Sequence, residues 1–237
     1  MPSEPPALTP LITGREPSLI SDGGGLPFAP AAPFAPFEPL DPSAAPVVAL
    51  IRQIDLGRKQ ANRRGFFRGY GRLADLDPAQ KLAGWRELAA TEDEILYARG
   101  RPPHLLTVAV KRAGRREKWA VVGVSNSRQL RASRQGIRAS SWRLDPEFET
   151  SPSQTELHLL VTEQTQATGV MADDRLLAPD LYVGTDELIV RFYIKALEGY
   201  TGRTRRYETA VTVNLPEPIG ERPVRDGAVY EPPGAVT

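Results

Sequence analysis

The sequence predicts a mainly β protein of the α+β class: an antiparallel β-sandwich or barrel, preceded by a short two-helix segment, with Pro-rich extended arms at both termini. Three observations lead to this class. Short segments with alternating apolar residues recur between residues 104 and 215, and helical spacing is confined to residues 45–103. Proline is concentrated at the ends of the chain, with 12 of the 23 prolines in residues 1–46.

The first 44 residues are predicted to form an extended or disordered arm. The stretch LPFAPAAPFAPFEPLDP (26–42) places Phe28, Phe34 and Phe37 between closely spaced prolines. Because proline fixes φ and lacks an N–H donor, this stretch favours neither a helix nor an inner strand. It is either a disordered tail or a stiff arm whose phenylalanines dock into apolar pockets of a neighbouring subunit. Residues 216–237 contain five further prolines and are predicted to form a second tail.

Residues 45–103 are predicted to be a basic helical segment. A first helix begins near Ser43 and buries one face, formed by Val47, Leu50, Ile51 and Ile54. A second helix begins with a capping box in which Asp77 and Gln80 flank Pro78. Apolar residues at helical spacing extend this helix to Leu96, and Gly100 followed by two prolines ends it.

From residue 104 onwards the pattern favours strands. The segments 104–112 and 117–124 read as a hairpin, and strands are expected at 137–144, 155–163, 186–197 and 205–215. The last two are predicted to pair through the loop EGYTGRT. In the strand 186–197 the residues expected to face the core are Leu188, Val190, Phe192 and Ile194.

Charge is distributed unevenly along a chain whose net charge is only +1. Residues 1–44 carry a net charge of −4, residues 45–143 carry +13 and residues 144–237 carry −8. Such polarisation indicates an anionic partner or charge-complementary self-association.

Two basic clusters are candidate polyanion-binding sites. The first contains the stretch RRGFFRGYGR (63–72), in which arginines could neutralise phosphates while aromatic rings stack on bases. The second is SRQLRASRQGIR (127–138), where a helical turn would align the arginines. The alternative for the first cluster is that its aromatic residues belong to a core. The candidate residues are Arg58, Lys59, Arg63, Arg64, Phe66, Phe67, Arg68, Tyr70, Arg72, Arg128, Arg131, Arg134 and Arg138.

Residues suited to catalysis are sparse. The chain has no cysteine, and its two histidines, His104 and His158, lie in apolar strand contexts typical of structural histidines. The acidic residues between Asp173 and Glu187 lack the alternate spacing of a calcium loop. We therefore expect no catalytic residue, no metal site and no cofactor.

These patterns predict a non-enzymatic structural subunit of a larger assembly, of the virion- or phage-like machine type. Its partners would be other protein subunits, as a homo-oligomer or in a multi-protein complex, without a membrane. The alternative is a nucleic-acid-binding protein that uses the clusters 58–72 and 128–138. The N-terminus lacks the pattern of a secretion signal, so the expected location is the cytoplasm or an assembled particle.

Overall fold

A computed structural model describes residues 5–36, 38–64, 77–102, 104–113, 118–126, 129–163, 170–197 and 207–231, with the side chains of α1 described as far as Leu56. The prediction of a mainly β protein with two α-helices is confirmed. The chain divides into unit 1, residues Met1–Ile20 with Leu130–Thr237, and unit 2, residues Ser21–Gln129. Unit 2 is thus an insertion within unit 1.

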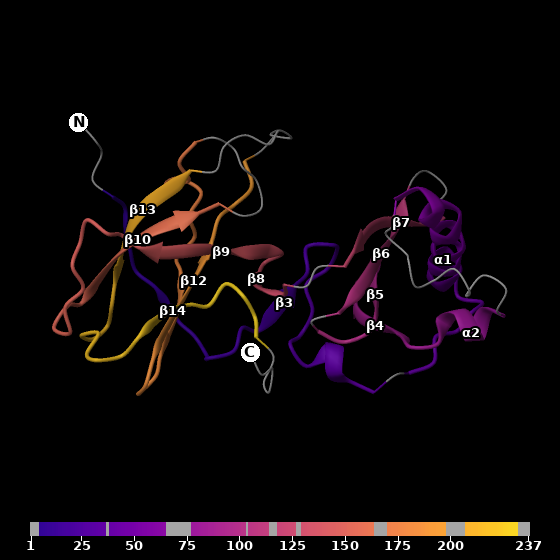
Figure 1. Cartoon of the computed structure of the whole chain (residues 1–237), viewed down its shortest axis with the longest axis horizontal. Helices are drawn as coiled ribbons and strands as arrows, with labels where there is room; N and C mark the ends of the chain where they lie inside the picture. Colours follow the sequence, from indigo (N-terminus) through magenta and orange to yellow (C-terminus); the bar gives the residue numbers. More distant parts are fainter. Residues whose placement is uncertain are drawn as a thin grey trace. The chain divides into compact units, whose positions relative to one another are not determined.

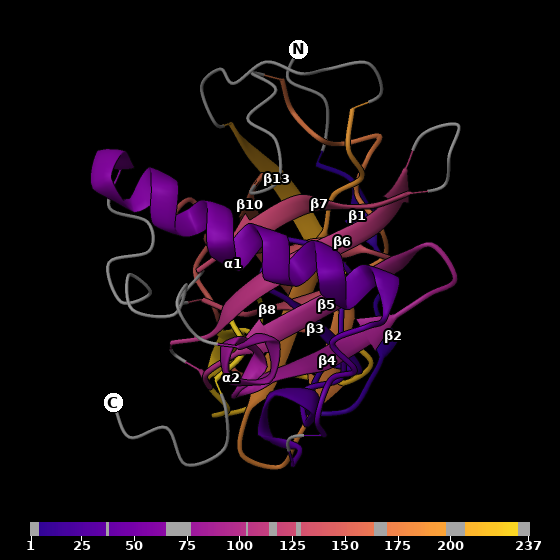
Figure 2. The same ribbon diagram turned by 90° about the vertical axis from the view of Figure 1, so that its right-hand side faces the viewer.

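Unit 2 is built on a four-stranded antiparallel sheet in the order β4-β5-β6-β7. Helix α1 (Ala45–Arg64) crosses one face of this sheet, as Figure 2 shows. The predicted helical face is confirmed, because Val47, Leu50 and Ile54 are buried in one core with residues of the sheet. The strands are β4 (Trp85–Ala90), β5 (Glu94–Arg99), β6 (Leu106–Ala113) and β7 (Lys118–Ser125).

The second helix is much shorter than predicted. The capping box of α2 (Pro78–Leu82) forms, since the Asp77 carboxylate accepts from the backbone N–H of Gln80 at 2.9 Å. The helix then ends, because Gly84 adopts a φ of 78° that other residues rarely take. Residues 85–99 form the hairpin β4–β5 instead of a helix, so the prediction of a helical segment up to residue 103 is wrong for these residues.

The other face of this sheet is covered by the stretch SDGGG (21–25). A Cβ atom at Gly24 would lie 2.7 Å from the Ser125 side chain, and one at Gly25 would lie 2.8 Å from that of Ala109. Only glycine allows the backbone to approach the strands this closely. The Asp22 carboxylate is buried and accepts from Thr107 Oγ1 and from the N–H of Gly24. Unit 2 therefore has a helix on one face of its sheet and a glycine-rich backbone on the other.

The N-terminal arm is folded onto its own chain. Phe28 is only 1% exposed, so this one ring is buried within its own chain and is not available to a neighbouring subunit. The buried Arg86 guanidinium holds the Pro-rich stretch by donating from Nη2 to the Pro33 carbonyl at 2.6 Å. Phe34 remains 39% exposed, and Phe37 lies outside the described residues.

Unit 1 consists of two groups of strands that face one core (Figure 1). One group is ordered β1-β13-β10-β9 and the other β12-β11-β2, with β14 beside β12. Strand β9 joins them, because its residues 141–144 pair with β10 while Ser140 and Ala139 pair with β12. The strands are β1 (Ala7–Leu8), β2 (Leu11–Ile12), β9 (Ile137–Leu144), β10 (Glu156–Thr162), β11 (Asp180–Val183), β12 (Leu188–Tyr193), β13 (Glu208–Asn214) and β14 (Val224–Asp226).

The N-terminal segment links the two groups a second time. Strand β1 pairs with β13 at one end of the sheet path, and β2 pairs with β11 at the other end. Only Thr9 and Pro10 separate these strands, and three extended residues span at most about 11 Å. The two ends of the path therefore approach each other, so that unit 1 curls into a partly closed sheet.

Several predictions about unit 1 need correction. Strands β12 and β13 do not form a hairpin with each other, because β9 and β10 lie between them. The pairs β1–β13, β2–β11 and β12–β14 are parallel, whereas a wholly antiparallel sheet was predicted. The C-terminal tail is folded as far as residue 231, with β14 in the sheet and Ala228 and Tyr230 buried. The core-facing set of β12 is confirmed, since Leu188, Val190, Phe192 and Ile194 all belong to the buried core.

The predicted hairpin of residues 104–124 belongs to a different body from the later strands. It forms as β6–β7, but in the sheet of unit 2. The insertion leaves and re-enters unit 1 at two neighbouring strands. These are β3 (Leu19–Ser21) and β8 (Arg131–Arg134), which pair with each other. The predicted single β body of residues 104–215 is therefore divided between two units.

Candidate functional site

Two arginines of the second basic cluster, Arg131 and Arg134, bind groups of their own unit. Residues 131–134 form strand β8 rather than a helical turn, so the arginine spacing does not align the side chains. Arg131 is 6% exposed and donates to the Ala139 carbonyl at 2.9 Å and to Ser141 Oγ at 2.6 Å. Arg138 is half-buried, and Arg128 lies outside the described residues. The prediction is wrong for Arg131, because its charge is used inside unit 1.

Arg134 belongs to a second internal network. Its guanidinium pairs with Asp180 at 2.6 Å, donates to the Ala178 carbonyl and lies 4.5 Å from the ring centre of Tyr193. The Tyr193 hydroxyl donates to the other oxygen of Asp180 at 2.9 Å. Burial, together with the Asp180 charge, raises the pKa of Tyr193 far above its ordinary value. These contacts tie β8, β11 and β12 together and leave Arg134 directed at protein groups instead of at a ligand.

The first basic cluster begins on helix α1. Arg58, Lys59, Arg63 and Arg64 lie in the last two turns of the helix backbone, and residues 65–76, with Phe66, Phe67, Arg68, Tyr70 and Arg72, lie outside the described residues. Helical periodicity puts positions 52, 59 and 63 on the side of α1 opposite the buried positions 47, 50 and 54. The backbone thus aligns three basic positions on the outer side of the helix.

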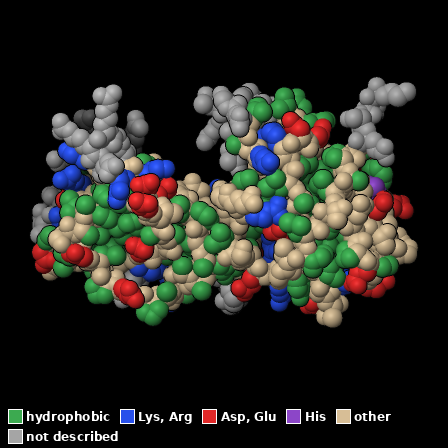
Figure 3. Space-filling view, turned by 180° about the vertical axis from the view of Figure 1, so that it is seen from behind, with side chains coloured by type: hydrophobic (Ala, Val, Ile, Leu, Met, Phe, Trp, Pro, Cys, Tyr) green, Lys and Arg blue, Asp and Glu red, His purple; other side chains and the backbone are tan. Residues whose placement is uncertain are grey.

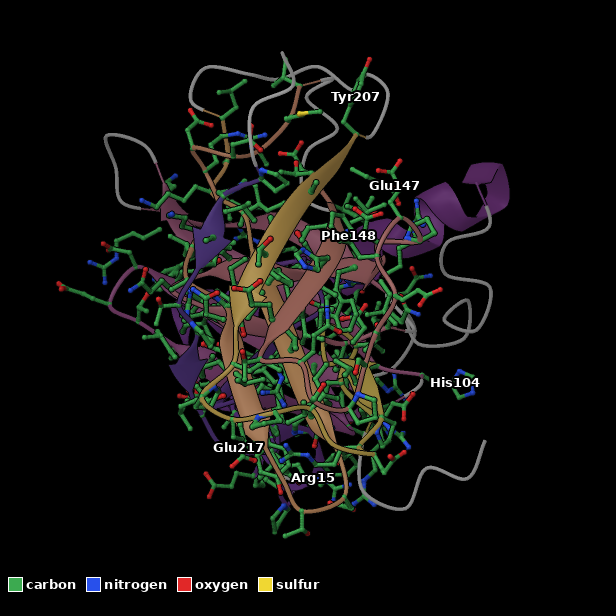
Figure 4. All side chains as sticks on the ribbon, turned by 90° about the vertical axis from the view of Figure 1, so that its left-hand side faces the viewer. Arg15, His104, Glu147, Phe148, Tyr207 and Glu217 are labelled. Carbon is green, nitrogen blue, oxygen red and sulfur yellow. The ribbon has the colours of Figure 1, made fainter. Side chains whose placement is uncertain are left out.

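The remaining polar candidates have structural surroundings. His158 lies on β10, where its ring stacks on Phe148 with centroids 4.0 Å apart and its Nδ1 lies 3.2 Å from Thr212 Oγ1. Figure 4 shows Phe148 and Glu147 beside the ribbon of unit 1, while His104 lies outside the strands of unit 2. Within the described residues, no three His, Asp or Glu side chains are grouped to hold a metal ion.

Sequence reasoning missed a charged cavity of about 440 Å³ in unit 1. Three distant segments line it: residues 15–17 of the N-terminal segment, β12 with the residue before it, and residues 225–231 of the C-terminal segment. Figure 4 shows its rim residue Arg15 at the end of unit 1 opposite Tyr207. The lining residues are Arg15, Glu16, Pro17, Glu187, Ile189, Arg191, Arg225, Asp226, Gly227, Val229, Tyr230 and Glu231.

Glu187 is the central carboxylate of this cavity. It is 5% exposed, and its Oε1 lies 2.7 Å from Arg15 Nη2 while its Oε2 lies 3.1 Å from Arg225 Nε. The Arg15 and Arg225 side chains are themselves 65% and 66% exposed. One buried carboxylate therefore holds two exposed guanidinium groups at the rim of the cavity.

Arg191 supplies a third guanidinium, and it is buried. It is 3% exposed, and it donates from Nη1 to the Gly14 carbonyl at 3.3 Å and from Nη2 to the Arg15 carbonyl. Its Nε is buried without a hydrogen-bond acceptor in the described part of the chain. Burial lowers the pKa of this guanidinium. Gly227 makes the arrangement possible, because a Cβ there would lie 2.9 Å from Arg191 Nε.

Asp226 faces the backbone instead of the arginines. Its Oδ1 accepts from the N–H of Ala228 at 2.8 Å, and its Oδ2 lies 3.4 Å from that of Trp142. Burial raises the pKa of its carboxyl group, although these hydrogen bonds act in the opposite direction. Its charge is therefore partly satisfied by N–H groups, and it forms no ion pair with the three cavity arginines in the described structure.

A signal for this cavity exists in the sequence but is weak. Arg191 interrupts the apolar run LIVRFY of β12, where a charge on an inner strand needs a buried partner. Nothing local links it to Arg15, which is 176 residues away.

Among the described side chains in Figure 3, Lys and Arg are interspersed with Asp and Glu on the visible face of both units, so that face shows no continuous basic surface.

No helix in the described part of the chain is long and apolar enough to cross a membrane. Comparison of the chain with protein-family models, with curated proteins and with solved structures finds no match.

Proposed function

We propose that the protein is a non-enzymatic subunit of a larger assembly, in which the basic unit 2 contacts acidic surfaces of neighbouring protein subunits. The observation that carries this proposal is that charge divides along the structural boundary. Unit 2 contains 17 Lys and Arg against 11 Asp and Glu, a net charge of +6, whereas unit 1 contains 13 against 18, a net charge of −5. Two bodies of opposite charge in one chain favour association between copies, since each copy offers both halves of the contact.

The outer side of α1 is the surface we expect to make this contact. Arg52 is exposed, and positions 59 and 63 follow it on the same side of the helix. Phe28 of the Pro-rich arm is buried in its own chain, so we do not base the contact on this ring. Association would therefore depend on charge and weaken as salt screens it.

Light scattering coupled to size exclusion at 50 and 500 mM NaCl tests this proposal. We expect a defined multimer at low salt that dissociates at high salt. Changing Arg52, Lys59 and Arg63 together to Glu should give monomers at both salt concentrations. The matched control changes Arg101, Lys111 and Lys118 of the same unit to Glu, which alters net charge equally but leaves α1 intact. A monomer at every salt concentration, or equal loss in both variants, contradicts the proposal.

Nucleic-acid binding is the second candidate, favoured by the basic positions on α1 and the aromatic residues that follow in the sequence. With Arg131 and Arg134 engaged inside unit 1, this function depends mainly on the cluster 58–72. Fluorescence anisotropy with a single-stranded oligonucleotide should then show binding that weakens steeply with salt. Changing Arg63, Arg64 and Arg68 to Ala should reduce the slope of log K against log salt by roughly 2. An unchanged slope excludes this cluster as the binding site.

A further inference from the structure

The cavity of unit 1 brings three arginines together, although four carboxylates also line it. Arg15, Arg191 and Arg225 contribute three guanidinium groups, and in the described structure Glu187 is the carboxylate that pairs with two of them. Arg191 donates from Nη1 and Nη2 to backbone carbonyls, and its buried Nε has no acceptor in the described residues. A buried N–H group without an acceptor is costly, so the Nε of Arg191 favours an additional hydrogen-bond acceptor in the cavity.

Free donors on the two rim arginines point to where an anion would bind. Arg225 uses Nε on Glu187, and Arg15 uses Nη2, so each guanidinium keeps further N–H groups without a partner in the described residues. Arginine offers five donors in a planar fork that matches the two oxygens of a carboxylate or phosphate. The buried carboxylate of Glu187 forms ion pairs with both guanidinium groups and so keeps them at this cavity.

We propose that this cavity is a binding site for a small organic anion that presents a carboxylate or phosphate group. Arg15 and Arg225, which both pair with Glu187, bind the oxyanion, and the buried Arg191 adds a fixed positive charge to the same cavity. Pro17, Ile189, Val229 and Tyr230 supply apolar surface for the organic part of the molecule. The volume of about 440 Å³ suits a small molecule.

The acidic residues of the cavity restrict the class of ligand. Glu16 and Glu231 are exposed and line the same cavity as the arginines. They would repel a nucleic acid or another polyanion while leaving the guanidinium groups accessible to a ligand with one anionic group. The site is thus distinct in chemistry and in place from the surface of unit 2 proposed to contact neighbouring subunits.

Isothermal titration calorimetry at constant ionic strength tests this site with three probes: inorganic phosphate, phenyl phosphate and benzoate. We expect saturable one-to-one binding, with phenyl phosphate or benzoate tighter than inorganic phosphate because the ring contacts the apolar wall. The stronger of the two aromatic probes then distinguishes a phosphate site from a carboxylate site. Absence of saturable binding for all three probes, or heat that follows ionic strength alone, overturns the proposal.

Variants at the rim locate the site without threatening the fold, since both side chains are about two-thirds exposed. Arg15→Gln and Arg225→Gln should each weaken binding at least about ten-fold, the loss expected when a charge-assisted hydrogen bond is removed. Arg143→Gln is the matched control, because Arg143 is an exposed arginine of unit 1 outside the cavity. Equal affinity in all three variants would place the binding elsewhere and refute the assignment.

Discussion

At the scale of single residues, the internal arginines are the most informative feature of unit 1. Arg131, Arg134, Arg175 and Arg191 each bind carbonyl or carboxylate groups of their own chain. A basic sequence run therefore does not by itself indicate a surface, because arginine supplies several donors for backbone carbonyls that would otherwise be unsatisfied. This explains why part of the positive charge that suggested a polyanion partner is not available to one.

The buried ion pair between Arg175 and Glu163 can be used to measure how much an internal arginine contributes to the stability of unit 1. The two side chains are 7% and 5% exposed, and Arg175 Nη1 lies 2.5 Å from Glu163 Oε1. Changing Arg175 to Met removes one half of this buried ion pair, so we expect a loss of about 3 kcal/mol in the free energy of unfolding. Glu208→Gln breaks an exposed pair and should cost less than about 1 kcal/mol. Urea denaturation followed by the fluorescence of Trp142 measures both, and equal losses would contradict the expectation.

Tyr97 should make unit 2 sensitive to alkali. It is buried in the core under α1, and burial, with the Glu87 charge, raises its pKa to about 12. An unfolded tyrosine ionises near pH 10, so above that pH the unfolded state loses a proton that the folded state keeps. Stability then falls as pH rises from 10 to 12, by about 1.4 kcal/mol per pH unit for this group. Tyr97→Phe should remove that contribution, and denaturation curves with the same pH dependence as the wild type would contradict it.

At the scale of elements, sequence patterns within a few residues correctly predicted single helices and strands. The helix of residues 45–64, the capping box of Asp77 and the strand 137–144 all appear, because each depends on periodicity or capping within a few residues. The hairpin β4–β5 was missed because Trp85 and Leu88 also fit helical spacing. The decisive signal was Gly84, whose positive φ ends the helix.

The pairing of strands could not be predicted in the same way. Strand β12 pairs with β9 and β11, and with β14 more than 30 residues further along the chain, and these choices depend on burial of both faces rather than on loop composition. The charged cavity is equally non-local, since it needs Arg15 and Arg225 beside Glu187. Glu187 was considered only as part of an acidic run, and its sequence neighbours do not reveal its arginine partners.

The N-terminal strands β1 and β2 should protect the two ends of the sheet path. Deleting residues 1–12 exposes the backbone groups of β13 and β11, and exposed strand edges pair with other chains. We expect lower stability of unit 1 and association that increases with protein concentration, measured by light scattering. Deletion of residues 1–4 alone is the control and should have neither effect. A monomer of unchanged stability after the longer deletion would show that the edges are protected in another way.

At the scale of the whole molecule, the insertion predicts two separable folding units. Each unit has its own core, one around Leu159 and Val190 and the other around Leu50 and Tyr97. Replacing residues 22–129 with a Gly/Ser linker of about ten residues should leave unit 1 folded, because β3 and β8 are paired neighbours.

The tryptophans allow the folding of the two units to be followed separately. Trp142 belongs to unit 1, whereas Trp85 and Trp119 belong to unit 2. Trp142 is held by a hydrogen bond from Nε1 to the Val190 carbonyl at 3.0 Å. The shortened chain should show one cooperative thermal transition by Trp142 fluorescence, and the full chain should show two by calorimetry. Loss of the cooperative transition in the shortened chain would mean that unit 1 needs the insertion to fold.

The link made by residues 7–12 also determines how unit 1 responds to mechanical force. Each of the strands β1 and β2 is held to the sheet over only two residues, whereas β10 is held to β13 over seven. A pull applied through the N-terminus therefore meets its weakest attachment first. In a force-extension experiment we expect the N-terminal segment to detach at low force and to lengthen the molecule before the main strands yield. A tether attached at the N-terminus would therefore not transmit high force to the main strands until the N-terminal segment had detached.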